Sequence, residues 1–108
     1  MEGVIMLDES LFVSDTIHER EVELADGTKH KMHFKELPAV EYSKFFNEQA
    51  SDDADIAAGA AAKLISAGLC TAEGKKAITY EQALRLKAGP MNAIFSALME
   101  VNGTQGKG

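Results

Sequence analysis

The sequence predicts an α+β fold, in which an antiparallel β-hairpin at about residues 17–37 is followed by, and packed against, four short-to-medium α-helices. A turn signal, Ala25-Asp26-Gly27, separates two strand-like runs. Downstream of the hairpin, apolar residues recur at helical spacing between start and stop signals. Because a lone hairpin is marginally stable in water, these helices are expected to cover its apolar face.

The length of the hairpin loop determines which side chains share a face. A two-residue loop would mix apolar and charged residues on both faces. A three-residue loop places Gly27 where a type I turn with a bulge needs a left-handed residue. Acidic residues then lie opposite basic residues or histidine: Glu23 opposite Lys29, Glu21 opposite Lys31 and Glu19 opposite His33. The other face collects Val22, Leu24, Met32 and Phe34, so we predict the three-residue loop.

The chain length is enough for one domain with a modest core, at 108 residues. We predict a single α+β domain at residues 17–102. Residues 1–16 are expected to be a variable or partly mobile N-terminus, with a short strand near Leu11–Val13 as the alternative. The apolar-free end of the chain, residues 103–108, is predicted to be a disordered tail.

The first predicted helix runs from Pro38 to about Glu48, with Pro38 as its first helical residue. Its aromatic residues recur at helical spacing and are expected to pack on the apolar face of the hairpin; they are Tyr42, Phe45 and Phe46. The second helix is expected to be capped by Ser51 or Asp52 and to reach about Ala67. Gly68 fits a left-handed stop at its end.

The interior of the second helix carries almost no side chains, so a neighbouring helix can approach it closely. The residues expected to allow this close packing are Ala57, Gly59, Ala60 and Ala61. Alanine favours the helix, whereas Gly59 costs about 1 kcal/mol relative to alanine. The neighbour is either another helix of the same chain or a helix of a second subunit.

Two helices are predicted in the last third of the chain. Thr79 and Gln82 form a capping box that opens a helix from Tyr80 to about Lys87. Gly89-Pro90 is expected to end it, and Pro90 to begin the last helix, which reaches Val101. The last helix carries an apolar stripe with two open interpretations, packing on the domain's own core or protein interaction; the candidate interaction residues are Met91, Ile94, Phe95, Leu98 and Met99.

The composition argues against several classes of partner. The net charge of -6 and pI near 5.0 disfavour nucleic acid and anionic membranes. No apolar run approaches the roughly 20 residues of a membrane span. A single cysteine, Cys70, excludes an internal disulfide and fits a reducing compartment. The default expectation is a soluble cytoplasmic protein.

No catalytic, metal-binding or cofactor-binding residue emerges, and we predict that the protein is not an enzyme. The three histidines, His18, His30 and His33, do not provide four convergent ligands on the predicted register. Cys70 has no histidine nearby in sequence and is read as a buried thiol. The glycines at 68 and 74 are one residue too far apart for a phosphate-binding loop.

Several short motifs follow one another along the chain. In the hairpin and the helix after it they are Asp26-Gly27-Thr28 and Leu37-Pro38-Ala39-Val40. The C-terminal part adds four more elements: Gly74-Lys75, Ile78-Thr79, Glu81 and Glu100-Val101-Asn102-Gly103. In this order, from about residue 22 to residue 103, the chain resembles the tail assembly chaperones of long-tailed, non-contractile (lambda-like) bacteriophages.

The resemblance implies a non-enzymatic protein that acts during viral tail assembly in the host cell cytoplasm. Such chaperones bind the tape measure protein, help recruit tail tube protein, and are absent from the mature virion. A longer form made by ribosomal frameshifting is a further implied partner. We expect a homo-oligomer that forms through helix faces and not through the charged face of the hairpin.

Other functions stay open on the sequence. One is an acidic phage inhibitor that mimics DNA, although Lys29, Lys31 and Lys35 interrupt the acids of the hairpin. Another is a generic protein-interaction domain. An uncharacterised enzyme or metal protein would be detected by metal analysis of the purified protein.

Overall fold

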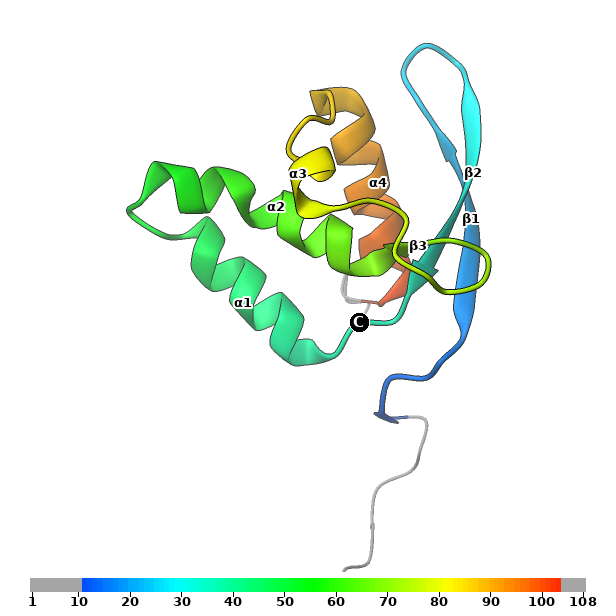
Figure 1. Cartoon of the computed structure of the whole chain (residues 1–108), viewed down its shortest axis with the longest axis horizontal. Coiled ribbons are helices and arrows are strands. Elements are labelled where there is room, and N and C mark those ends of the chain that lie inside the picture. Colours follow the sequence, from blue (N-terminus) through cyan, green and yellow to red (C-terminus); the bar gives the residue numbers. More distant parts are fainter. Residues whose placement is uncertain (1–10, 104–108) are drawn as a thin grey trace, which may run out of the picture.

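The computed structural model describes residues 11–103 and confirms the α+β fold. Three antiparallel strands form one sheet in the order β1-β2-β3, and four helices accompany it (Figure 1). The strands are β1 (Ile17–Glu23), β2 (Lys29–Lys35) and β3 (Leu69–Cys70); the helices are α1 (Ala39–Gln49), α2 (Ala54–Gly68), α3 (Tyr80–Ala83) and α4 (Ala88–Val101).

The hairpin has the predicted three-residue loop. Glu23 lies opposite Lys29, Glu21 opposite Lys31 and Glu19 opposite His33. The Leu24 N–H donates to the Thr28 carbonyl at 2.9 Å, which closes the loop, and Gly27 has a φ of 87°. This left-handed conformation costs glycine little, which is why the loop contains it. The Asp26 carboxylate accepts hydrogen bonds from Thr28, which lower the pKa of Asp26.

The short strand β3 extends the sheet beyond the hairpin and was not predicted. Leu69 pairs with Phe34 and Cys70 with His33, while Cys70 also bridges to Lys76. The turn that follows is closed by the Thr71 N–H, which donates to the Lys75 carbonyl at 2.8 Å. A strand of only two residues, Leu69 and Cys70, is too short to show the alternation of a strand, so the sequence does not distinguish it from the end of the preceding helix.

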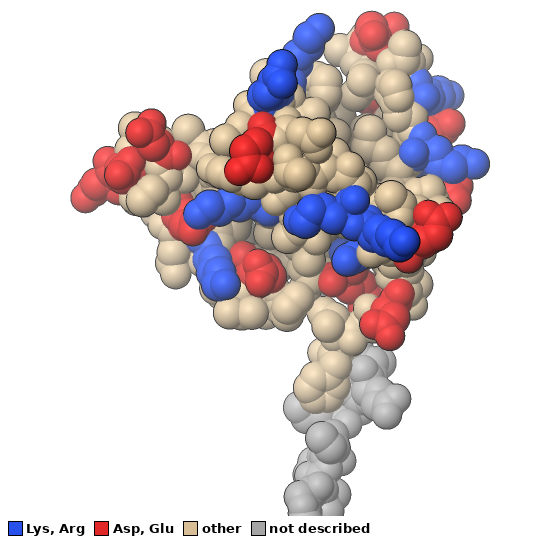
Figure 2. Space-filling model, in the orientation of Figure 1, with Lys and Arg blue, Asp and Glu red and all other residues tan. Residues whose placement is uncertain are grey.

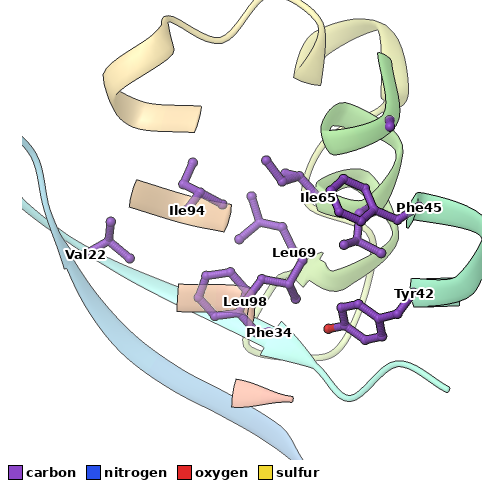
Figure 3. Close-up of a cluster of buried hydrophobic side chains, with 10 residues drawn as sticks. Val22, Phe34, Tyr42, Phe45, Ile65, Leu69, Ile94 and Leu98 are labelled. Atoms are coloured by element: carbon purple, nitrogen blue, oxygen red, sulfur yellow. The ribbon is translucent and has the colours of Figure 1, made fainter. Parts of the chain in front are cut away.

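Helix α4, and not α1, supplies the main cover of the hairpin. Val22 and Phe34 project from the hairpin into the same core cluster as Ile94 and Leu98 of α4 (Figure 3). Helix α1 packs chiefly against α2, along its flank, and runs away from the hairpin (Figure 1). The prediction that the aromatic face of α1 packs on the hairpin therefore holds only in part: Tyr42 and Phe45 join the core cluster that contains Val22 and Phe34, but the main packing partner of α1 is α2.

The core lies where α4, α2 and the sheet converge, and α1 adds Tyr42 and Phe45 to it (Figure 3). Its largest fully buried side chains are Phe34, Ile65 and Leu98. Burial of such side chains contributes about 1.5–3 kcal/mol each relative to leaving them exposed. The core residues are Val22, Phe34, Tyr42, Phe45, Ala60, Leu64, Ile65, Leu69, Ile94 and Leu98.

The N-termini of the first two helices differ slightly from the predicted ones. Pro38 precedes α1 as its N-cap with an extended backbone, so it is not the first helical residue. Asp53 caps α2, because its carboxylate accepts hydrogen bonds from the N–H groups of Asp55 and Ile56. Ser51 instead accepts a hydrogen bond from the Asp53 N–H and supports that cap.

Gly68 does not end α2 as a left-handed residue, and the prediction was wrong. It is the last residue of the helix, and the chain passes from it directly into β3. A Cβ atom added at Gly68 would lie 2.5 Å from Leu98 Cδ1 and 3.4 Å from Leu37 Cδ1. The glycine is therefore required by the close approach of α4 and not by the backbone conformation.

The third helix is shorter than predicted and the fourth begins earlier. The capping box of Thr79 and Gln82 is present, with Thr79 Oγ1 accepting from the Gln82 N–H at 3.1 Å. Helix α3 ends at Ala83, and Gly89-Pro90 lies in the first turn of α4 instead of between the helices. Proline is tolerated there because the N–H groups of the first turn have no partner within the helix.

No residue of Leu11–Val13 belongs to a strand, so the alternative of a short strand there was wrong. All three side chains are largely exposed. Most of the N-terminal segment 1–16, and the predicted tail after Gly103, lie outside the described residues.

Candidate interaction surfaces

The apolar stripe of α4 is for the most part not a surface. Ile94 is 3% exposed and Leu98 is fully buried, so a partner could reach them only by opening the core. Of the two interpretations of the stripe, packing on the domain's own core therefore applies to Ile94 and Leu98, because the hairpin needs α4 as its cover. Met91, Phe95 and Met99 are partly buried against the same core.

The small residues of α2 face other parts of the same chain. A Cβ atom at Gly59 would lie 2.5 Å from the hydroxyl oxygen of Tyr80, so α3 occupies this position. Ala60 is buried in the core, and Ala57 and Ala61 are partly buried. Within residues 11–103, the small residues of α2 therefore already pack against α3 and the core of the same chain.

Several large apolar side chains on the helices are instead exposed. Val40 and Phe46 of α1 are 56% and 53% exposed, and Ile56 of α2 is 43% exposed. Phe46 lies near the end of α1 and Ile56 near the start of α2, so both lie at the end of the helix pair where the chain turns (Figure 1). The predicted burial of Phe46 with the other aromatic residues of this helix is therefore wrong.

An aromatic series connects exposed Phe46 with α4. The ring centroids of Phe46 and Phe45 lie 5.2 Å apart in an edge-to-face arrangement, and those of Phe45 and Phe95 are also 5.2 Å apart. Such aromatic pairs add about 0.5–1.5 kcal/mol each beyond the area that they bury. The exposed ring therefore rests on a rigid base, and its position does not depend on a mobile loop.

Asn102 holds the end of α4 to the segment between β2 and α1. Its side-chain oxygen accepts from the Leu37 N–H at 2.6 Å, and its nitrogen donates to the Leu98 carbonyl at 3.0 Å and to the Lys35 carbonyl at 3.4 Å. Burial raises the pKa of Tyr42 to about 12, and the nearby Asn102 side chain opposes this rise. The Tyr42 hydroxyl has no hydrogen bond of ordinary geometry.

Glu36 connects the N-terminal segment with the start of the hairpin. Its carboxylate accepts from the Ser14 N–H at 2.8 Å and lies 2.9 Å from His18 Nε2. The hydrogen bond from Ser14 makes the larger contribution and that from His18 the smaller one, and both lower the pKa of Glu36 below its usual value of 4.5. A lowered pKa in the folded state means that the ionised carboxylate stabilises the fold.

The stability that Glu36 contributes is expected to be present above about pH 4.5 and to be lost as the pH falls through the lower pKa of the folded state. Chemical unfolding of the parent and of Glu36→Gln should differ most near neutral pH and converge in acid. A constant difference between the two proteins from pH 7 to pH 3 would contradict this assignment.

The remaining titratable groups do not assemble a reactive site among residues 11–103. His33 lies 3.6 Å from Glu19, and His30 lies 3.2 Å from the Thr28 hydroxyl, both near the surface of the hairpin. Cys70 is buried, and burial raises the pKa of its thiol. In this part of the chain no group of three His, Cys, Asp or Glu side chains could hold a metal ion.

Charges of both signs are interspersed on the surface. Figure 2 shows acidic and basic side chains side by side over the hairpin and the helices, with acids alone at the tip of the α1–α2 pair. A DNA mimic would present a continuous acidic face, which this view does not contain. Between residues 11 and 103, no helix has the length and hydropathy to span a membrane.

No protein-family model, curated protein or solved structure matches this chain.

Proposed function

We propose that this protein is a non-enzymatic tail assembly chaperone of a long-tailed, non-contractile bacteriophage. In this function it binds the tape measure protein and helps to recruit tail tube protein during virion morphogenesis in the host cell cytoplasm. The longer frameshifted form is a further partner, and neither form remains in the mature virion. The proposal depends on the order of the sequence motifs described above.

The motif residues have structural roles that account for their presence. Gly74 has a φ of 85°, Thr79 caps α3, and Asn102 holds α4 to the hairpin connection. Each is located where the chain changes direction or where two elements are joined. The motif residues are therefore residues that shape the fold.

The observation that carries the client-binding part of the proposal is the exposure of Phe46 and Ile56. A long helical client displays apolar side chains until the tube encloses it, so its chaperone needs accessible apolar surface. Phe46 is about half exposed and rests on Phe45. We assign the client contact to this end of the α1–α2 pair.

The test is co-expression with the tape measure protein from the same gene cluster. The parent is expected to keep that protein soluble and to co-purify with it. Phe46→Ser/Ile56→Ser should reduce the co-purified fraction at least about tenfold, because hot-spot side chains contribute about 2 kcal/mol or more. The yield of soluble tape measure protein and the ratio of the two proteins after purification are the measurements.

Leu84→Ser is the matched control, since Leu84 is 49% exposed but lies between α3 and α4. It should leave co-purification unchanged. If the tape measure protein precipitates with the parent and also with the longer form, the chaperone function is excluded. If it stays soluble with all variants, the function stands but the assignment of the binding surface is wrong.

A further inference from the structure

The strand β1 has one open edge along its whole length. Within residues 11–103 it pairs only with β2. Because the Leu24–Thr28 pair closes the loop with a hydrogen bond, the even-numbered residues of β1 direct their N–H and C=O groups to β2. The odd-numbered residues direct theirs outward; they are Ile17, Glu19, Glu21 and Glu23.

The strand β2 also has an open edge, but only near the hairpin tip. The strand β3 covers His33 and Phe34. In the described part of the chain no strand pairs with the outer side of Lys29 to Lys31. The alternation in β2 leaves the N–H and C=O groups of Lys29 and Lys31 directed outward. Both lysine side chains are exposed.

The charges on the two edges decide which edges can pair. Two β1 edges would place glutamates opposite glutamates, and two β2 edges would place lysines opposite lysines, which is unfavourable. When β1 pairs antiparallel with β2 of a second copy, the outward N–H and C=O groups can form hydrogen bonds only if odd-numbered residues lie opposite each other. Over Glu19–Glu23, every such register places a glutamate opposite a lysine.

The side of β1 that faces α4 has room for an added strand. An open groove lies beside Val22, between Glu21, Glu23 and the α4 residues Ala93, Ser96, Ala97 and Glu100. The three small residues leave this groove unfilled. When Glu21 lies opposite Lys31 of the second copy, His30 of that copy lies opposite Val22, on the side of the groove.

We propose that copies of this chain associate edge to edge, with the glutamate-bearing edge of β1 pairing with the lysine-bearing edge of β2 in the next copy. The two edges are different surfaces, so each copy can bind one neighbour on each side, and the assembly is an open array or a closed ring. The inference is independent of the proposed chaperone function. It differs from the expectation that helix faces carry self-association; two residues of the α4 stripe, Ile94 and Leu98, are buried.

Analytical ultracentrifugation of the full chain tests the proposal. The mass of the parent should rise over a roughly hundredfold concentration range. The rise should be larger at about 0.01 M than at about 1 M salt, where the Debye length falls from about 30 Å to about 3 Å. Glu21→Lys/Glu23→Lys and Lys29→Glu/Lys31→Glu should each associate at least about tenfold more weakly, because like charges then meet.

An equimolar mixture of these two variants is the decisive sample. Each variant loses the charge match within its own hairpin, so weaker association alone could reflect a weaker fold. In the mixture the edges match again between copies, while the mismatch within each hairpin remains. Recovery of association in the mixture is therefore expected only if the edges pair between copies.

The matched control is Asp52→Lys/Glu81→Lys, which changes the net charge as much as the first variant at two exposed positions, one before α2 and one in α3, that do not belong to either edge. It should associate as the parent does. Circular dichroism reports whether each variant is folded. Glu21→Pro supplies a test without charge reversal, since it removes the outward N–H together with the carboxylate, and it should associate more weakly than Glu21→Ala, which removes the carboxylate alone. A monomeric parent at low salt, or a mixture that does not associate, would overturn the proposal.

Discussion

Replacing Leu98 by aspartate is expected to unfold the domain. Leu98 has no exposed surface and lies between the sheet and the end of α2, where Gly68 makes room for it (Figure 3). Truncation of a buried leucine to alanine costs about 2–5 kcal/mol, and an unpaired buried charge costs several more. A domain of this size is stable by only about 5–15 kcal/mol.

Circular dichroism and the loss of a cooperative thermal transition are the measurements for Leu98→Asp. Leu84→Asp is the control, because that side chain is about half exposed and should tolerate the charge. Leu98→Ala should remain folded with a lower midpoint. A folded Leu98→Asp protein that only fails to associate would mean that Leu98 serves an interface and that its burial within the chain is not essential.

Asn102→Ala is expected to cost about 1–3 kcal/mol of unfolding free energy, because a group that loses its hydrogen-bond partner on folding costs about that much. The Leu37 N–H loses its acceptor and the Lys35 carbonyl loses a donor, whereas the Leu98 carbonyl still accepts from the Asn102 backbone N–H at 3.1 Å. The bonds to Leu37 and Lys35 join residues far apart in sequence, so α4 should also detach more easily from the hairpin connection. Denaturant unfolding and amide exchange at Leu37 measure the two effects.

Two further variants separate the parts of this interaction. Asn102→Asp keeps the acceptor for the Leu37 N–H but directs a carboxylate oxygen at the carbonyls of Lys35 and Leu98, at the negative end of α4, so at neutral pH its loss of stability should be at least as large as that of Asn102→Ala. Asn92→Ala changes an exposed asparagine of the same helix and should cost nothing, because alanine favours the helix. Equal losses for Asn92→Ala and Asn102→Ala would show that the bonds of Asn102 do not stabilise the fold.

The hairpin register could be predicted from the sequence because its causes are local. Only one loop length separates the charged from the apolar side chains, and Gly27 lies where that loop needs a left-handed residue. The capping box of Thr79 and Gln82 is local in the same sense. In both cases the interacting groups lie within a few residues of each other, so their spacing was sufficient.

The candidate surfaces could be predicted only in part. The spacing of Ile94 and Leu98 identified an apolar stripe, but the same spacing occurs in helices that pack on their own core and in helices that form an interface. Phe46 was predicted to be buried with the other aromatic residues of its helix, but only its neighbour Phe45 is buried and Phe46 is exposed. The open edges of β1 and β2 depend on how far β3 extends along the sheet, and β3 is too short to be read from its sequence.

Short-range spacing and charge were therefore enough to predict the α+β class, the hairpin register and one helix cap. The tertiary structure alone decided that α4 covers the hairpin while α1 packs on α2. It also decided the role of Gly68, which is required by Leu98, thirty positions along the chain. Such choices follow from the close packing of distant side chains, whose fit depends on shapes and distances that no local pattern contains.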